Sequence, residues 1–128
     1  MKNGIPLLLA ALLLAGCGAR TEAAPDYRQI TMAEAVEILE TESGHILLDV
    51  RTPEEFASGH IPGAVNIPNE SIGTQQIPEL PDKAQRILVY CRSGNRSKQA
   101  SEKLAALGYT NVIEFGGINS WPGQVVTE

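Results

Sequence analysis

One cysteine lies at a junction that restricts how the surrounding chain can fold. The apolar run Ile87–Tyr90 leads directly into Cys91, and a helical pattern with Ala100, Leu104 and Leu107 on one face begins a few residues later. A short apolar run followed by a helix is typical of a buried strand in an α/β protein. The sequence therefore predicts that Cys91 ends a buried strand and immediately precedes the N-terminus of a helix.

The loop between that strand and that helix favours a reactive thiolate. Cys91–Arg96 reads Cys-Arg-Ser-Gly-Asn-Arg, so two full positive charges and the partial charge of a helix N-terminus surround the sulfur. Gly94 and Asn95 tolerate the left-handed backbone that a tight loop requires, and the amides of such a loop can cradle an anion. A buried structural cysteine is the alternative interpretation, but it gains nothing from flanking arginines.

Patterns along the rest of the chain predict alternating strands and helices. Capping boxes at Thr31 and Thr52 mark two helix starts, and Asn69–Leu80 reads less clearly, as one helix and a loop. The predicted strands are Tyr27–Ile30, Ile46–Val50, Ala64–Ile67, Ile87–Tyr90 and Asn111–Phe115. This alternation predicts an α/β fold with a central parallel sheet of about five strands and helices on both faces. Functional sites in such sheets lie at the carboxyl ends of the strands.

The N-terminal segment has the features of a targeting signal. Lys2 precedes the apolar run Ile5–Ala15, which is too short to span a membrane comfortably. The run ends in Leu14–Cys17, Leu-Ala-Gly-Cys, which resembles a bacterial lipobox. We therefore expect a signal peptide over residues 1–16, a lipidated Cys17 with a tether over 17–26, and one folded domain over 27–128. An ordinary signal peptide or a buried helix is the alternative.

These boundaries place the protein outside the cytoplasm. Acyl chains on Cys17 would anchor it to a bacterial membrane, on the periplasmic or cell-surface side. The chain holds two cysteines among its 128 residues, so lipidation of one leaves Cys91 without an intramolecular partner. A formal charge of −5 argues against nucleic acid as a partner. His45 and His60 lack a useful ligand spacing, so no metal site is expected, and we expect a monomer.

Three segments, in order, resemble the signatures of rhodanese-type sulfurtransferases. The first runs from Leu48 to Pro68 and contains Asp-Val-Arg-Thr-Pro-Glu-Glu-Phe and Gly-His-Ile-Pro-Gly-Ala. The second is Cys91–Ser97, and the third is Gly116–Ile118 with Trp121. The likeness covers one domain, roughly Tyr27 to Val126. It implies a rhodanese-like fold and the transfer of sulfane sulfur from thiosulfate or a persulfide to a thiol or cyanide.

The resemblance also implies roles for individual residues. Cys91 is the nucleophile that carries a persulfide, and the backbone amides of Arg92, Ser93, Gly94, Asn95 and Arg96 hold its charge. Arg92 attracts a small anionic donor, whereas Arg96 is either catalytic or a structural partner of a carboxylate. No cofactor is implied, and a thiol or a reducing protein is the expected acceptor.

The residues around the loop are expected to have structural roles. Asp49 and Arg51 are expected to pair and hold the architecture, and Ser97 to cap the helix or donate to the loop. His60 is expected to be a hydrogen-bonded turn residue, and Trp121 to pack against the core beside the site.

Two other function classes stay open at this point. One is a sulfur carrier or persulfide-binding module without turnover. The other is a cysteine-dependent phosphatase or an arsenate-reductase-like enzyme. Such phosphatases resemble this loop but place five residues between the cysteine and the arginine, whereas four separate Cys91 from Arg96. The shorter loop favours a single outer sulfur over a tetrahedral phosphate.

Overall fold

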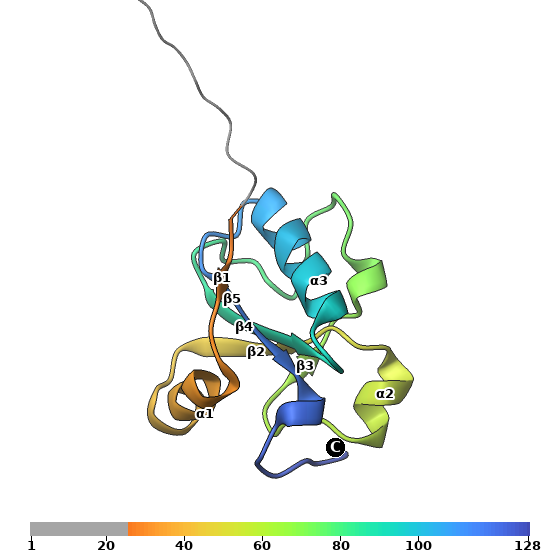
Figure 1. Ribbon diagram of the computed structural model, residues 1–128. Helices are drawn as coiled ribbons and strands as arrows, with labels where there is room; N and C mark the ends of the chain where they lie inside the picture. Colours follow the sequence, from red (N-terminus) through yellow and green to blue (C-terminus); the bar gives the residue numbers. More distant parts are fainter. Residues whose placement is uncertain (1–25) are drawn as a thin grey trace, which may run out of the picture.

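The computed structural model describes residues 26–128, which form a five-stranded parallel sheet covered by helices (Figure 1). The strands are β1 (Arg28–Gln29), β2 (His45–Asp49), β3 (Val65–Asn66), β4 (Arg86–Cys91) and β5 (Val112–Gly117). The helices are α1 (Met32–Thr41), α2 (Pro53–Ser58), α3 (Asn95–Ala106) and the 3-10 turns η2 (Asn69–Ser71) and η3 (Ile118–Ser120). The strand order is β1-β5-β4-β2-β3, so β4 is central. The predicted α/β class and parallel sheet are confirmed.

Both capping boxes predicted from the sequence begin helices. The Thr31 side chain accepts from the Glu34 amide at the start of α1, and the Glu34 carboxylate accepts from the Thr31 amide in return. Thr52 and Glu55 make the same exchange at the start of α2, where Pro53 is the first helical residue. Each box satisfies two amides that the helix leaves without partners, so local sequence fixes both starts.

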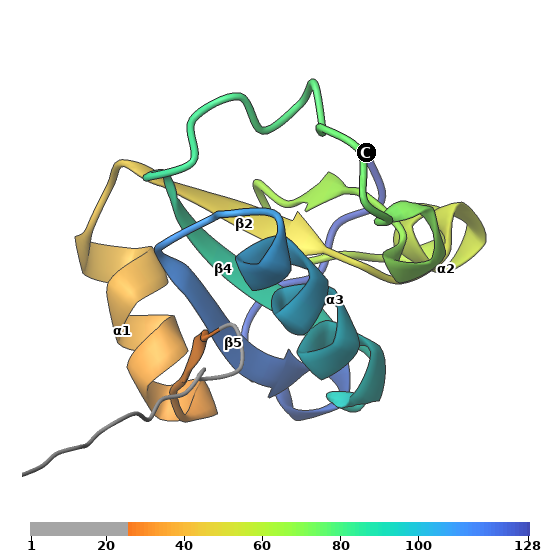
Figure 2. The ribbon, with the colours of Figure 1, turned by 90° about the horizontal axis from the view of Figure 1, so that it is seen from above.

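The core consists of two apolar clusters on opposite faces of the sheet. Figure 2 shows the helices that cover them, α1 and α3, on opposite sides of the sheet. Successive residues of a strand point to opposite faces, so Val89 and Cys91 of β4 join one cluster and Leu88 and Tyr90 join the other. α3 covers the first cluster with Ala100 and Leu104, among others, and α1 covers the second. Cys91 therefore belongs to the face that α3 covers.

Three expectations need correction in detail. β1 and β3 have two residues each, shorter than predicted, because each lies at an edge and pairs with one neighbour only. The helix expected within Asn69–Leu80 is only the 3-10 turn η2. Pro78 interrupts this segment, which Ile72, Ile77 and Leu80 anchor in the core. The predicted signal peptide and all of the predicted tether except Asp26 lie outside the described residues. Within 26–128 no helix has the length and apolarity needed to cross a membrane.

Candidate active site

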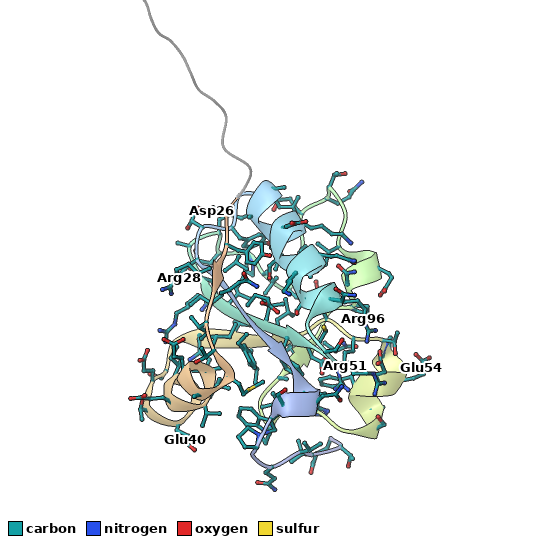
Figure 3. The ribbon with its side chains drawn as sticks, in the orientation of Figure 1. Asp26, Arg28, Glu40, Arg51, Glu54 and Arg96 are labelled. Carbon is teal, nitrogen blue, oxygen red and sulfur yellow. The ribbon has the colours of Figure 1, made fainter. Side chains whose placement is uncertain are left out.

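Cys91 is the last residue of β4, at the carboxyl edge of the sheet where strand-end sites are expected. The neighbouring strand β2 ends at Asp49, which pairs in register with Tyr90. Figure 3 shows Arg51, Glu54 and Arg96 at this end of the domain, beside α2, and Asp26 and Arg28 far from it. Cys91 is 1% exposed, so its sulfur lies at the base of the loop that follows.

The loop after Cys91 leads to the N-terminus of α3, and one of its amides contacts the sulfur. Gly94 is the N-cap of α3 with φ +116°, a conformation that favours glycine, and no side chain caps the helix. Its amide donates to Cys91 Sγ at 3.0 Å. Ser93 is exposed in the loop, and Asn95 is already the first helical residue, so Gly94 is the one of the two residues that adopts the left-handed backbone. The uncapped first-turn amides of α3 remain available to a negative charge beside Sγ.

The Gly116–Gly117 signature lies directly beneath this loop. The pairing of β4 with β5 shifts between Val89 and Cys91, which places Gly117 opposite Cys91. A Cβ atom on Gly117 would lie 2.0 Å from the carbonyl oxygen of Arg92, a distance that no real atom could occupy. The Arg92 carbonyl instead accepts from the Asn119 amide at 3.1 Å. Glycine at 117 is therefore required for the close approach of loop and strand.

Glu55 on α2 binds both arginines of the loop. Arg92 donates to Glu55 Oε2 through Nε at 3.0 Å and Nη2 at 2.5 Å. Arg96 donates to Oε1 at 2.7 Å and to Oε2 at 3.0 Å. The hydrogen bonds from Arg96, and then those from Thr52 and Arg92, outweigh partial burial and hold the pKa of Glu55 well below its usual range. The carboxylate thus ties the loop to α2.

The two arginines differ in exposure, which separates the donor-attracting role expected of Arg92 from the catalytic or structural role expected of Arg96. Arg92 has a side chain that is 54% exposed, at the mouth of the loop, whereas that of Arg96 is 26% exposed. Arg96 pairs with the carboxylate of Glu55, as expected if its role is structural. The contacts of Glu55 with the two arginines were not predicted, because the capping box already accounted for an acidic residue at this position. Its position on the signature segment was the available signal.

A second carboxylate, Glu114 of β5, lies behind the cysteine and was also missed. Ser97 Oγ donates to Glu114 Oε2 at 2.5 Å and lies 3.4 Å from Cys91 Sγ. Ser97 is within α3 and Gly94 is the cap, so the helix-capping alternative for Ser97 is wrong. Its hydroxyl lies 2.9 Å from the Gly94 carbonyl, which agrees with the other alternative, donation to the loop. The signal for Glu114 was a lone acidic residue inside the apolar run Val112–Phe115. A fully buried acid in a central strand needs an explanation.

Asp49 and Arg51 form a buried ion pair. Arg51 Nη2 donates to Asp49 Oδ2 at 2.6 Å and to the carbonyl of Gly59 at 2.7 Å, so the pair ties β2 to the end of α2. The hydrogen bond and charge of Asp49 raise the pKa of Arg51, outweighing its burial. Tyr90 lies beneath the guanidinium and accepts from the Ile61 amide through its hydroxyl. The expected architectural role agrees with this geometry.

His60 and Trp121 lie apart from the sulfur. His60 stacks on Phe56, and its ring nitrogens lie 2.8 Å from the carbonyls of Phe56 and Glu128, as suits a hydrogen-bonded turn residue. Trp121 packs on the core as expected, but with the α1-side cluster, on the face opposite to Cys91. It also lines a cavity of about 450 Å³ that does not include Cys91. Within residues 26–128, no group of His, Cys, Asp and Glu is arranged to hold a metal.

Residues 26–128 form an α/β domain in which a cysteine ends the central strand beside an uncapped helix N-terminus. The family model of the rhodanese-like domain matches residues 31–124, and the chain belongs to this family. Sulfur transfer is thereby supported as the general class of activity.

Individual relatives agree with this assignment. Thiosulfate sulfurtransferase PspE of Escherichia coli (strain K12) is 41% identical over 71 residues, covering 56% of this chain and 68% of the relative. The chloroplastic thiosulfate sulfurtransferase 16 of Arabidopsis thaliana is 39% identical over 90 residues, covering 62% and 75%. The crystal structure of a rhodanese-related protein from Thermoplasma volcanium superposes with a TM-score of 0.66 at 34% identity, covering 80% of this chain and 100% of that one.

Proposed function

We propose that this chain transfers sulfane sulfur from thiosulfate or a low-molecular-weight persulfide to a thiol or cyanide, through a persulfide on Cys91. The observation that carries the proposal is the Gly94 amide donating to Sγ at 3.0 Å at an uncapped helix N-terminus. Such a position stabilises negative charge on sulfur, both in a thiolate and in the outer sulfur of a persulfide. The named sulfurtransferases among its relatives support the same chemistry.

The reaction has two half-reactions, and each balances without an outside oxidant. The Cys91 thiolate attacks the outer sulfur of thiosulfate; a new S–S bond forms, the S–S bond of the donor breaks, and sulfite leaves with its electron pair. A thiolate or cyanide then attacks the outer sulfur of the persulfide, and the Cys91 thiolate leaves. The amides of the loop from Arg92 to Arg96 would hold the outer sulfur between the two steps.

The charges at the mouth favour a small anionic donor. Arg92, Arg96 and Glu55 bring two positive charges and one negative, a net of one positive charge beside the buried sulfur. Arg92 is the exposed member, so it is the one that meets an approaching anion. Full exposure of both arginines would attract anions more strongly. The ion pair with Glu55 therefore moderates the attraction without removing it.

Mass spectrometry after incubation with thiosulfate tests the first half-reaction. The Cys91 peptide should gain one sulfur, and adding cyanide should remove it and yield thiocyanate with repeated turnover. Cys91→Ser should abolish both in a protein that stays folded, because a hydroxyl forms no persulfide. Sulfur loading without turnover would instead assign a carrier. Aryl phosphate hydrolysis without loading would assign a phosphatase, and turnover in folded Cys91→Ser would refute the mechanism.

We further propose that the domain works outside the cytoplasm, anchored by lipid on Cys17. The support is the sequence Leu-Ala-Gly-Cys at positions 14–17, after a short apolar run that follows Lys2. Cys17→Ala should release the protein from membranes or block its processing, while the purified protein keeps its rate with thiosulfate and cyanide. Wild-type protein with an intact Met1 in the soluble fraction would contradict the anchor and leave the sulfurtransferase assignment untouched.

A further inference from the structure

Three buried groups form a hydrogen-bonded chain on the side of the sulfur that faces the protein interior. The Cys91 thiol donates to Ser97 Oγ at 3.4 Å, and the Ser97 hydroxyl donates to Glu114 Oε2 at 2.5 Å. Cys91 is 1% exposed, Ser97 0% and Glu114 2%, so bulk water has little access to this chain. Its three members come from β4, α3 and β5, the elements that build the site.

The Glu114 carboxylate has neutral partners only. It accepts from the Gly116 amide at 2.9 Å and from Gln29 Nε2 at 3.1 Å, and none of the four ion pairs within residues 26–128 includes it. A buried carboxylate without a cation is costly to keep ionised. A thiolate on Cys91 would add a second negative charge only one hydroxyl away. Two like charges at such separation disfavour each other, so one of the two groups tends to keep a proton.

We propose that Cys91 and Glu114 share one proton through the Ser97 hydroxyl, which makes Glu114 a positioning residue for the nucleophile. In one arrangement the thiol donates to Ser97 and Ser97 donates to an ionised Glu114. In the other, the Cys91 proton has passed to Ser97 and the Ser97 proton to Glu114, leaving a thiolate and a neutral carboxyl. The Ser97 hydroxyl then donates to the thiolate.

The shift of the proton conserves charge and produces the nucleophile. One negative charge moves from Glu114 to Cys91, where the Gly94 amide and Ser97 hydroxyl both donate to it. No base from solvent is consumed. When a donor is attacked, the proton remains on Glu114, so the persulfide does not face an ionised carboxylate. The shared proton determines how Cys91 becomes nucleophilic, and its use in sulfur transfer rests on the proposed function.

Cys91 and Glu114 affect the pKa of two neighbouring groups, Arg96 and Tyr27, and neither of these exchanges protons near neutral pH. Arg96 on α3 has its pKa raised, chiefly by its hydrogen bonds to Glu55 and to a smaller degree by Cys91, so it stays charged. Tyr27, before β1, has its pKa raised above its ordinary 10.0 by burial first and then by the charges of Glu102 and Glu114, so it stays neutral. The shared proton is therefore exchanged between Cys91 and Glu114 alone.

The pH dependence of alkylation tests the proposal without any sulfur-transfer assay. The full chain carrying Cys17→Ala has Cys91 as its single thiol, and iodoacetamide reports the thiolate fraction. A pair that shares one proton has a thiolate fraction set by an internal equilibrium, so the rate should change by less than about threefold between pH 6 and pH 8.

Variants separate the shared proton from a packing role. Glu114→Gln keeps the shape but accepts no proton, so its rate should follow a single titration, rising about tenfold per pH unit below the midpoint. Glu114→Asp should restore a flatter profile. Gln29→Ala is the matched control. It removes a hydrogen bond to Glu114 that is not part of the Cys91–Ser97–Glu114 relay, so the alkylation rate should stay nearly independent of pH.

The proposal fails on either of two results. One is a wild-type alkylation rate that follows a single titration, rising about tenfold per pH unit below a midpoint. The other is a flat profile that persists in Glu114→Gln, which would mean a thiolate ionised independently of Glu114. The first result needs no variant of Glu114, so a misfolded variant leaves the test intact. Sulfur loading by thiosulfate could still succeed in each case, so failure here is distinct from failure of the proposed function.

Discussion

Replacing Glu55 by glutamine should weaken the fold and strengthen the binding of an anionic donor at the same time. The carboxylate holds Arg92 and Arg96 together at the mouth of the loop through four hydrogen bonds from the two guanidinium groups. Glutamine keeps a carbonyl oxygen that can accept from the Thr52 amide, so the capping box of α2 survives. The substitution therefore removes mainly the negative charge.

The loss of stability follows from the burial of the two pairs. Arg92 is more than half exposed, and such a surface pair contributes about 0–1 kcal/mol. Arg96 and Glu55 are less exposed, and losing a charge-assisted bond there costs about 1–2 kcal/mol. The two pairs together contribute about 1–3 kcal/mol, and losing them lowers the melting temperature of a domain of this size by about 5–15 °C.

The pH dependence of that loss gives a check on its cause. The pKa of Glu55 is lowered in the folded protein, chiefly by Arg96. The carboxylate therefore contributes stability fully above the ordinary carboxyl pKa of about 4.3, and this contribution is lost as the pH falls further. The difference in unfolding free energy between wild type and Glu55→Gln should shrink below about pH 4. A difference independent of pH would mean that the loss comes from packing.

Donor binding should move in the opposite direction. Removing the negative charge changes the net charge of the mouth from one positive to two, so the KM for thiosulfate should fall about two- to fivefold at low salt, and less in high salt. Glu54→Gln is the matched control, since Glu54 is the exposed neighbour and makes no ion pair among the described residues. A raised KM in Glu55→Gln with a normal kcat would refute the reasoning, since it would mean that the arginines bind a donor only when Glu55 holds them.

Three further results are expected. Arg92→Ala should raise the KM for thiosulfate by about 5–150-fold, because it removes a charge-assisted contact of about 1–3 kcal/mol, and it should leave the rate with a neutral persulfide donor largely unchanged. Equal losses with both donors would assign Arg92 to loop geometry. Asp49→Asn should cost about 3–5 kcal/mol in urea unfolding, because it leaves Arg51 buried without its counter-charge, and a loss below about 1 kcal/mol would count against the pair. Gly117→Ala should lower the free energy of unfolding by about 1–3 kcal/mol and reduce persulfide formation, because a Cβ at this position would clash with the Arg92 carbonyl. Normal sulfur loading, measured by mass spectrometry, would mean that the loop moves aside without affecting the site.

The elements that could be predicted are those fixed by nearby residues. The two capping boxes place the starts of α1 and α2, and the apolar run before Cys91 places β4, because each signal lies within a few residues of its effect. The short strands β1 and β3 were predicted too long, since their ends depend on where a neighbour stops pairing. No local pattern carries that information.

The site was only partly predictable for the same reason. Cys91 and its loop form one continuous segment, so their chemistry is visible in the sequence. Glu55 and Glu114 reach the loop from α2 and β5, 36 residues before Cys91 and 23 residues after it. Their contacts depend on the order of strands in the sheet. The sequence contained a signal for Glu114 alone, because an acidic residue is unusual inside an apolar run such as Val112–Phe115.

The division of the core into two clusters has a consequence for how such a domain can evolve. Cys91 and Tyr90 are neighbours in β4 but belong to different faces, and the loop after Cys91, α3 and Glu114 all lie on the Cys91 side. The α1 face, with its cavity bounded by Leu39 and Trp121, takes no part in holding the sulfur. Selection can therefore remodel α1 for new neighbours or new locations while the chemistry stays unaltered. Sequence divergence among descendants should accumulate first on α1, and later at Ile61 and Trp121, which line the same face but belong to the signature segments.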